Sequence, residues 1–281
     1  MSTYCISDIH GCFDEFMELI KLIQFEPAND TIYILGDAID RGDKSIECIR
    51  YIMQTKHIHM LMGNHEKMII GLFSNEYSGY GWSQYGHDST VQQFKDLSET
   101  ERGEILLYLR KLPYYKTLSV NGRRFFLSHS GLDVSVPFKY QNPDVLVWSR
   151  DEFYRWQALS KYIVVFGHTP VFYLRNDLLP YEKGVDRYDC SIWLDKRYND
   201  KICIDCGCVF GGALAALHLD DGQVFYVKSD RSVTDAALRF YFDATPVPVS
   251  FLDAEKLPRY QRRRQDIIAA FEFEDTTDPP D

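Results

Sequence analysis

The stretch from residue 3 to residue 66 decides the fold. It contains three apolar runs that each end in polar residues beside glycine: TYCISDIHG (3–11), TIYILGDAIDRG (31–42) and HIHMLMGNHE (57–66). Between them lie two segments, 13–25 and 44–55, whose apolar residues recur at helical spacing. Strands that alternate with helices through short links predict parallel pairing with right-handed crossovers. We therefore expect the first half of the chain to form a parallel, helix-covered sheet.

The polar residues of this stretch all follow the predicted strands directly. Open α/β sheets bind ligands at the carboxyl ends of their strands, so these side chains are expected to converge although about thirty residues separate each motif from the next. The candidates are Asp8, His10, Asp37, Asp40, Arg41, Asn64 and His65.

The chain beyond residue 115 has strand character. Segments 115–120 and 123–130 flank Asn121-Gly122, a strong hairpin signal, and further strands are predicted at 162–168, 201–207, 213–220 and 223–228. Two more motifs, SHSG (128–131) and GHTP (167–170), end two of these strands. Helices are predicted at 88–97 and 99–112, with Asp88 and Ser98 as caps.

Composition excludes several classes of protein. The net charge of −10 argues against nucleic-acid binding, which needs a basic face. No apolar stretch approaches the roughly 20 residues of a membrane span, and the N-terminus does not resemble a secretory signal. Seven cysteines, mostly in strand-like runs, favour a reduced, cytoplasmic chain. The late ones, at positions 190, 203, 206 and 208, lack a second CxxC partner and are assigned to packing, and Cys12 has no assigned role.

The five motifs together supply carboxylate, imidazole and amide ligands without thiolate. Such donors suit manganese, iron or zinc, and we expect two divalent ions, with Mn²⁺ favoured. Asp8 and His10 could hold the first ion, Asp37 could bridge both, and the remaining donors could complete the second. Those remaining donors are Asn64, His129 and His168. A pair of ions roughly 3.5–4 Å apart would lower the pKa of a shared water, and the resulting hydroxide would attack phosphorus in line.

A phosphate ester also needs a proton donor and anion clamps. His65 directly follows Asn64, so it should lie at the metal edge without being a ligand, and Asp40 could orient it and favour its charged form. Arg41 can grip phosphate oxygens with its planar fork, and Arg150 is a second candidate clamp.

These motifs resemble the phosphoprotein phosphatase branch of the calcineurin-like metallophosphoesterases, over roughly residues 1–230. SDIHG, GDAIDRG, GNHE, SHSG and GHTP match the family pattern, and VWSRDE (147–152) and CIDCGCVFGG (203–212) point to its small bacterial and phage members. The resemblance implies two mixed β-sheets packed as a sandwich with flanking helices. It also implies the six metal ligands named above, the His65–Asp40 acid pair and phosphate binding by Arg41 and Arg150.

The chain departs from that pattern in places that bear on substrate choice. Ser7 stands where the family has glycine, residues 85–87 read Tyr-Gly-His instead of Asn-Gly-Gly, and the stretch after GHTP is longer. Residues 231–281 form a predicted C-terminal extension, partly docked, with a disordered acidic tail.

The leading functional prediction is a phosphomonoesterase acting on phosphoserine, phosphothreonine or phosphotyrosine of proteins. The alternative is a hydrolase of dinucleoside polyphosphates such as diadenosine tetraphosphate, which shares most of the motifs; Asp40 and Glu66 favour the monoesterase. A catalytically dead binding module would need a missing ligand or acid, and none is missing. We expect a phosphoprotein or small phosphoester as partner, and neither nucleic acid nor a membrane.

Overall fold

Two five-stranded sheets form the centre of the computed structural model, which describes residues 1–74, 86–155, 157–159, 161–178 and 189–231. The first sheet has the strand order β10-β9-β1-β2-β3, and the second has the order β4-β5-β6-β8-β7. The strands of the first sheet are β1 (Thr3–Ile6), β2 (Thr31–Ile34), β3 (Ile58–Met60), β9 (Ala213–His218) and β10 (Val224–Lys228). Those of the second are β4 (Tyr115–Val120), β5 (Arg123–Ser128), β6 (Ile163–Phe166), β7 (Trp193–Leu194) and β8 (Lys201–Cys203).

Both sheets are mixed. Strands β1, β2 and β3 are parallel, as the alternation of strands and helices predicts, while β9 and β10 are antiparallel additions at the β1 side. In the second sheet β5, β6 and β8 are parallel, and β4 and β7 pair antiparallel at the two edges. The predicted α/β sandwich of two mixed sheets is therefore confirmed.

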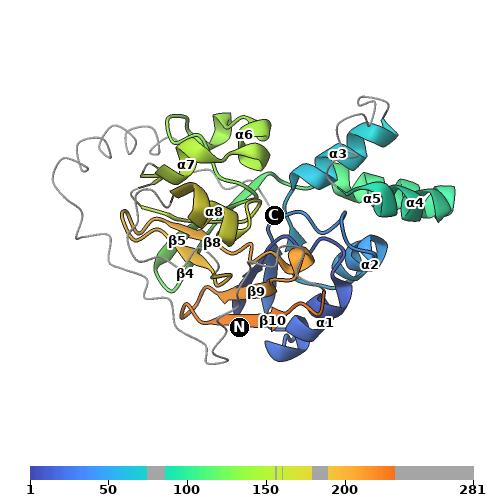
Figure 1. Ribbon diagram of the computed structural model, residues 1–281, viewed down its shortest axis with the longest axis horizontal. Helices are drawn as coiled ribbons and strands as arrows, with labels where there is room; N and C mark the ends of the chain where they lie inside the picture. Colours follow the sequence, from blue (N-terminus) through green and yellow to red (C-terminus); the bar gives the residue numbers. More distant parts are fainter. Residues whose placement is uncertain (75–85, 156, 160, 179–188, 232–281) are drawn as a thin grey trace.

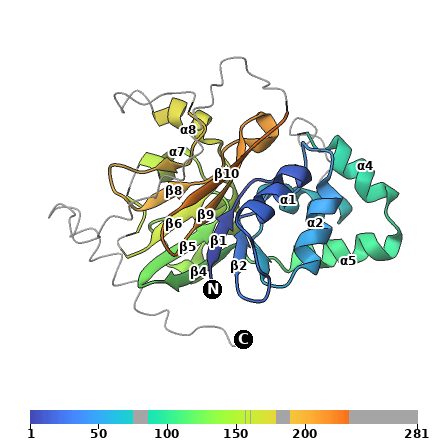
Figure 2. The same cartoon turned by 90° about the horizontal axis from the view of Figure 1, so that it is seen from below.

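Helices cover the outer face of each sheet, and the inner faces pack together (Figures 1 and 2). The helices beside the first sheet are α1 (Phe13–Leu22), α2 (Ser45–Gln54), α3 (Asn64–Phe73), α4 (Asp88–Asp96) and α5 (Glu99–Arg110). Those beside the second are α6 (Pro143–Trp148), α7 (Asp151–Arg155) and α8 (Val171–Leu178). Short 3₁₀ turns are η2 (Phe138–Tyr140) and η3 (Cys208–Phe210).

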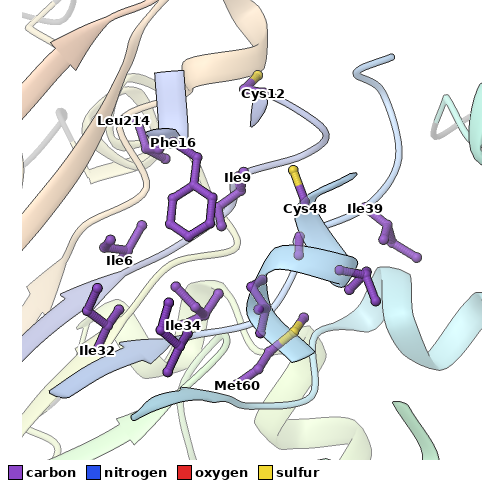
Figure 3. Packing of buried hydrophobic residues seen from close by; sticks show 14 of the residues in the cluster. Ile6, Ile9, Cys12, Phe16, Ile32, Ile34, Ile39, Cys48, Met60 and Leu214 are labelled. Carbon is purple, nitrogen blue, oxygen red and sulfur yellow. The ribbon is translucent and has the colours of Figure 1, made fainter. Parts of the chain in front are cut away.

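The alternation of side chains along each strand creates three buried layers. On the outer face of the first sheet, Ile6, Ile32 and Ile34 pack against Phe16 of α1 and Cys48 of α2 (Figure 3). Neighbouring residues on the same strands point the other way and meet the second sheet, where Cys5 and Leu217 pack with Phe125, Leu127 and Val165. The outer face of the second sheet buries Phe126, Val164 and Phe166 under α6 to α8. Because successive side chains of a strand alternate, one apolar run supplies two layers.

Most predicted elements form, with one error at a helix cap. The Asn121-Gly122 turn has positive φ at both residues, and the Ser98 side chain accepts from the Glu101 N–H at 3.2 Å, so the hairpin and the Ser98 cap are confirmed. The Asp88 cap is wrong, because α4 already includes Asp88 and the residue before it, His87, makes no side-chain cap. The predicted extension and tail from residue 232 onward lie outside the described residues.

The described helices include none that is both long and apolar enough to cross a membrane.

Candidate active site

The site lies where the strands of both sheets end, and the strand ends bring the motifs together as predicted. The turn after β1 carries Asp8 and His10, and the turn after β2 carries Asp37, Asp40 and Arg41. Asn64 and His65 open α3 directly after β3. The second sheet contributes His129 after β5 and His168 after β6.

The backbone around these residues is unusually bent. Among the described residues, ten that are not glycine have positive φ, and six of them belong to the candidate site, with φ between +46° and +71°. These six are Asp8, His10, Asp37, Asp40, Arg41 and His168. Such conformations cost free energy in side-chain-bearing residues and persist where surrounding contacts impose them, often at functional sites.

Backbone hydrogen bonds hold the first two turns to each other. The His10 N–H donates to the Asp37 carbonyl at 2.9 Å, and the Gly11 N–H donates to the Ala38 carbonyl at 2.9 Å. Gly36 has a φ of +94°, and a Cβ there would lie 2.6 Å from the Gly63 Cα, so only glycine fits between the second and third turns. Backbone hydrogen bonds and close backbone packing thus hold the three turns next to one another.

Glu66 has a structural role at the site that the sequence analysis does not predict. Its buried carboxylate accepts from the backbone N–H groups of Asp37 at 2.8 Å, Ala38 at 2.9 Å and Gly63 at 3.1 Å. Burial first, and the nearby Asp37 carboxylate second, raise the pKa of Glu66 to about 8. The fixed spacing of GNHE was the available signal, because the fourth residue of a helix start can reach back to bind backbone N–H groups.

The Asp37 carboxylate is the centre of the site. Its Oδ2 lies 3.3 Å from His129 Nε2, 3.6 Å from His10 Nε2 and 3.8 Å from His65 Nε2. Burial alone would raise the pKa of Asp37, but the imidazoles of His129 and His65 hold that pKa well below its usual value. Asp37 is therefore ionised and shared by two groups of potential metal-binding atoms: with His10 and His65 on one side, and with His129 and His168 on the other.

The His10 and His129 rings each place Nδ1 against a backbone carbonyl and Nε2 toward the Asp37 carboxylate. His10 Nδ1 lies 2.7 Å from the Ile39 carbonyl and His129 Nδ1 lies 2.9 Å from the Leu35 carbonyl, so each Nδ1 carries the hydrogen. In the neutral rings, Nε2 then faces oxygen acceptors: Asp37 in both cases and, for His129, the Asn64 Oδ1 at 2.8 Å. His129 has a raised pKa and is protonated in the metal-free protein. Once that proton leaves, the ring nitrogens, the Asp37 carboxylate and the Asn64 oxygen all present lone pairs to the same space, so these residues fit divalent metal ions.

The second histidine pair completes this picture. His168 Nδ1 lies 3.0 Å from Asn64 Oδ1 and 3.1 Å from His129 Nε2. Burial, and then the His129 charge, hold the pKa of His168 well below its usual value, so that ring is neutral. Burial and the Arg41 guanidinium likewise hold the pKa of His10 well below its usual value. Neutral imidazole is the form that binds metals.

Asp8 lies at the seam between the two sheets. Its Oδ2 accepts from Ser7 Oγ and from the His168 N–H, the latter at 3.0 Å, and its Oδ1 lies 3.9 Å from His10 Nε2. The serine that departs from the family pattern therefore contacts a candidate ligand directly.

His65 and Asp40 form the buried pair that the sequence predicts. His65 Nδ1 lies 2.6 Å from Asp40 Oδ2, and both side chains are fully buried. The Asp40 backbone N–H is bound by Ser45 Oγ at 3.1 Å and Thr90 Oγ1 at 3.0 Å, two supports that no motif revealed. The pair leaves Nε2 of His65 facing the centre of the site.

The two predicted arginine clamps are placed differently. The Arg41 guanidinium contacts His10 Nε2 and lies over the Phe210 ring, with Cζ 5.4 Å from the ring centroid. Arg150 is exposed and donates to Thr169 Oγ1 at 3.0 Å, beside the GHTP motif. Arg41 thus lies within the cluster and Arg150 at its rim. Tyr85, which departs from the family pattern, lies outside the described residues.

Comparison with known proteins matches the calcineurin-like phosphoesterase family over residues 1–211. A symmetrical bis(5'-nucleosyl)-tetraphosphatase of Buchnera aphidicola subsp. Baizongia pistaciae is 31% identical, covering 82% of this chain and 99% of the relative. One of the same name from Chromobacterium violaceum is 26% identical, covering 80% and 94%.

Two solved structures share the fold. One, described as a candidate diadenosine tetraphosphatase, has a TM-score of 0.59 at 18% identity and covers 82% of this chain and 95% of its own. The other, a cold-active protein-tyrosine phosphatase from a psychrophilic Shewanella species, has a TM-score of 0.54 at 17% identity, covering 80% and 77%. With a family match over residues 1–211 and a 31% identical relative that covers 82% of its length, the chain belongs to the calcineurin-like phosphoesterases, a family of hydrolytic enzymes.

Proposed function

We propose that this enzyme hydrolyses dinucleoside tetraphosphates symmetrically, cleaving diadenosine tetraphosphate into two molecules of ADP. The observation that carries the proposal is the nearly end-to-end similarity to a symmetrical bis(5'-nucleosyl)-tetraphosphatase at 31% identity. This reverses the order of the two functions that the sequence motifs suggest.

The structure weakens one argument for a protein phosphatase. Glu66 favoured the monoesterase in the sequence, but its carboxylate binds three backbone N–H groups and so shapes the turn that carries Asp37. Such a role is required whatever the substrate. Phosphoprotein hydrolysis remains the second candidate, supported by the close His65–Asp40 pair, because an alkoxide leaving from serine needs a proton more than ADP does.

The roles of the residues follow from their placement. Asp8, His10, Asp37, Asn64, His129 and His168 would hold two divalent ions, with Asp37 shared between them. When bound, the ions would supply Lewis-acid polarisation of a phosphoryl oxygen and lower the pKa of water. Asp40 would keep the proton on His65 Nδ1 and orient Nε2, which would donate a proton to the leaving oxygen.

The two arginines would bind the phosphate chain. Arg41 reaches the cluster and can pair with phosphoryl oxygens through its fork of donors. Arg150, at the rim, is placed to bind a phosphate further along the chain, an arrangement that suits a substrate with four phosphates.

One parallel assay tests the proposal. The Mn²⁺-loaded enzyme is offered diadenosine tetraphosphate, a phosphoserine peptide and p-nitrophenyl phosphate, and products are separated by chromatography. We expect ADP as the only nucleotide product and a kcat/KM for the tetraphosphate at least about tenfold above that for the peptide, which is about 1.4 kcal/mol of transition-state binding. Preference for the peptide, or release of AMP with ATP, would contradict the proposal.

A further inference from the structure

A second cluster of metal-binding side chains lies outside the active site. Cys12 precedes α1, Glu15 lies in the first turn of α1, and Cys208 begins η3. One ligand atom from each residue lies within 4.8 Å of the other two. We call these three residues the thiol cluster. None of them is among the residues assigned to the two active-site ions.

The thiol cluster is closely packed and already linked by hydrogen bonds. The Cys12 and Cys208 thiols are hydrogen-bonded to each other, and Ser229, which follows β10, contacts the Cys208 thiol. Ser229 Oγ also donates to Glu15 Oε1 at 3.0 Å. Both cysteines are buried, at 0% and 1% exposure, whereas Glu15 is half-buried and gives access from solvent. Four potential donors from three separate segments therefore meet at one point.

The chemistry of these donors differs from that of the active site. Two thiolates with a carboxylate form a donor set that selects soft or borderline cations such as Zn²⁺, whereas the active-site set contains no sulfur. Arg231, a positive charge that interacts electrostatically with Cys12 and Glu15, is paired with Asp43 at 2.6 Å. We propose that the thiol cluster binds a third, thiophilic divalent cation of the Zn²⁺ class, with Cys12, Cys208 and Glu15 as ligands and Ser229 or water completing the site.

Such an ion would join the active-site turn to the far end of the first sheet. The Cys12 Sγ lies 3.8 Å from the His10 carbonyl, and Cys12 follows the SDIHG motif directly. In Figure 3 the Cys12 sulfur points away from Ile9 and Phe16, toward the edge of the packed group. A cation bound there would fasten the start of α1 to η3 and to the end of β10, and so steady the turn that carries His10.

Cobalt substitution tests this site without any activity measurement. Co²⁺ bound by thiolates gives an intense near-ultraviolet charge-transfer band, and the proposed active-site ligands cannot produce one because they lack sulfur. We expect Co²⁺ titration of the full-length, reduced protein to produce this band with the intensity of one thiolate-bound ion per chain once all sites are filled, and three equivalents of Zn²⁺ to abolish it. Cys208→Ala should remove the band, and Glu15→Gln should weaken Co²⁺ affinity about tenfold or more while keeping the band.

A matched variant and a second deletion complete the experiment. Cys206→Ala alters a buried cysteine two positions away that packs between the sheets, and it should keep the band. Cys12→Ser should lose the band, with thermal melting confirming that each variant is folded. Absence of the band in the wild type, or its persistence in either Cys208→Ala or Cys12→Ser, would overturn the proposal. Neither result depends on which phosphoester the enzyme cleaves.

Discussion

The two sheets contribute to the active site in different ways. The turns of the first sheet hold one another through their own backbones, as in the His10–Asp37 hydrogen bond of 2.9 Å. Within the part of the chain that the structure describes, the second sheet supplies His129 and His168 to the cluster, and both are anchored by the first sheet. His129 Nδ1 donates to the Leu35 carbonyl at 2.9 Å, and the His168 N–H donates to Asp8 Oδ2 at 3.0 Å.

This difference shows how the site is assembled. The turns of the first sheet hold one another in place, while the second sheet brings its two histidines to the site only once the two sheets have packed. The inter-sheet core, which includes Cys5, Leu127 and Val165, therefore determines the positions of His129 and His168. Substitutions on the two sides should consequently have separable effects on metal binding, proton transfer and pH dependence.

The largest effect is expected from Asp37→Asn, which removes the charge shared between the two halves. Loss of one anionic ligand should prevent pairing of the ions and reduce kcat/KM by about 10⁴-fold or more, because paired ions contribute several kcal/mol to the transition state. Metal content measured by plasma mass spectrometry should fall below two equivalents. An active variant that retains both ions would show that Asp37 does not bridge the two sides.

His65→Ala should be the next most damaging change. It removes the proposed acid from the first sheet but leaves the ligands, so turnover should fall about 10²–10⁴-fold while metal content stays at two equivalents. The loss should be greater for a phosphoserine peptide than for p-nitrophenyl phosphate, because the nitrophenolate leaves without protonation. His65 Nε2 lies 3.8 Å from Asp37 Oδ2, close enough for both to bind the same ion. Loss of one ion in this variant would therefore show that His65 is a ligand and not the acid.

Glu66→Gln should have an intermediate effect and tests how firmly the turns of the first sheet are held. Gln keeps the shape but loses one of the two oxygens that bind backbone N–H groups, so the Asp37 turn should shift. We expect metal affinity to fall about 10- to 100-fold, as it does when partners of metal ligands are removed. Glu18→Gln, an exposed glutamate on α1, is the matched control and should leave affinity unchanged. Equal affinity in the two variants would contradict the supporting role of Glu66.

The smallest effect concerns pH and the second sheet. Burial by itself would lower the pKa of His129. Asp37 and other nearby carboxylates have the larger combined effect and raise this pKa to about 9 in the metal-free protein. A proton therefore occupies this ligand at neutral pH, and metal affinity should rise with pH up to about 9, by at most about tenfold per unit for one proton. Calorimetry in buffers of different ionisation enthalpy should detect proton release on metal binding.

The same His129 proton has a consequence for the stability of the metal-free protein. Its folded pKa lies above its unfolded value, so its contribution is fully present below about pH 6.5 and is lost as pH rises through about 9. Burial lowers the pKa of His59, so His59→Ala should alter the profile only at lower pH and leave the loss of stability near pH 9 unchanged. For the metal-binding prediction, an affinity that does not change with pH would mean that His129 is not a metal ligand.

Local pattern was sufficient for much of the fold. The parallel β1–β2–β3 unit, its helices and the Asn121-Gly122 turn follow from periodicity and turn chemistry, which act over a few residues. The Asp88 cap failed because the cap depends on backbone geometry one residue earlier, at His87, which composition does not fix. The sequence also pointed first to a protein phosphatase, since motifs shared by related hydrolases identify the chemistry more readily than the substrate.

Supporting contacts were beyond the reach of sequence patterns. Ser45 and Thr90 both bind the Asp40 N–H, but they come from α2 and α4, which become neighbours only in the folded chain. The thiol cluster is another case, because Cys12 and Cys208 show no metal-binding spacing, and the sequence assigned Cys208 to packing.

The sequence by itself determined which residue types end each strand, and therefore the class of chemistry: carboxylates, imidazoles and an arginine aimed at a phosphoester. Only the tertiary structure decided that Asp37 is shared, that Glu66 shapes its turn and that Cys12 meets Cys208. The physical reason is range. Backbone preference and side-chain alternation operate between neighbours in the chain, whereas lone pairs and thiols converge only after apolar faces of two sheets have packed together.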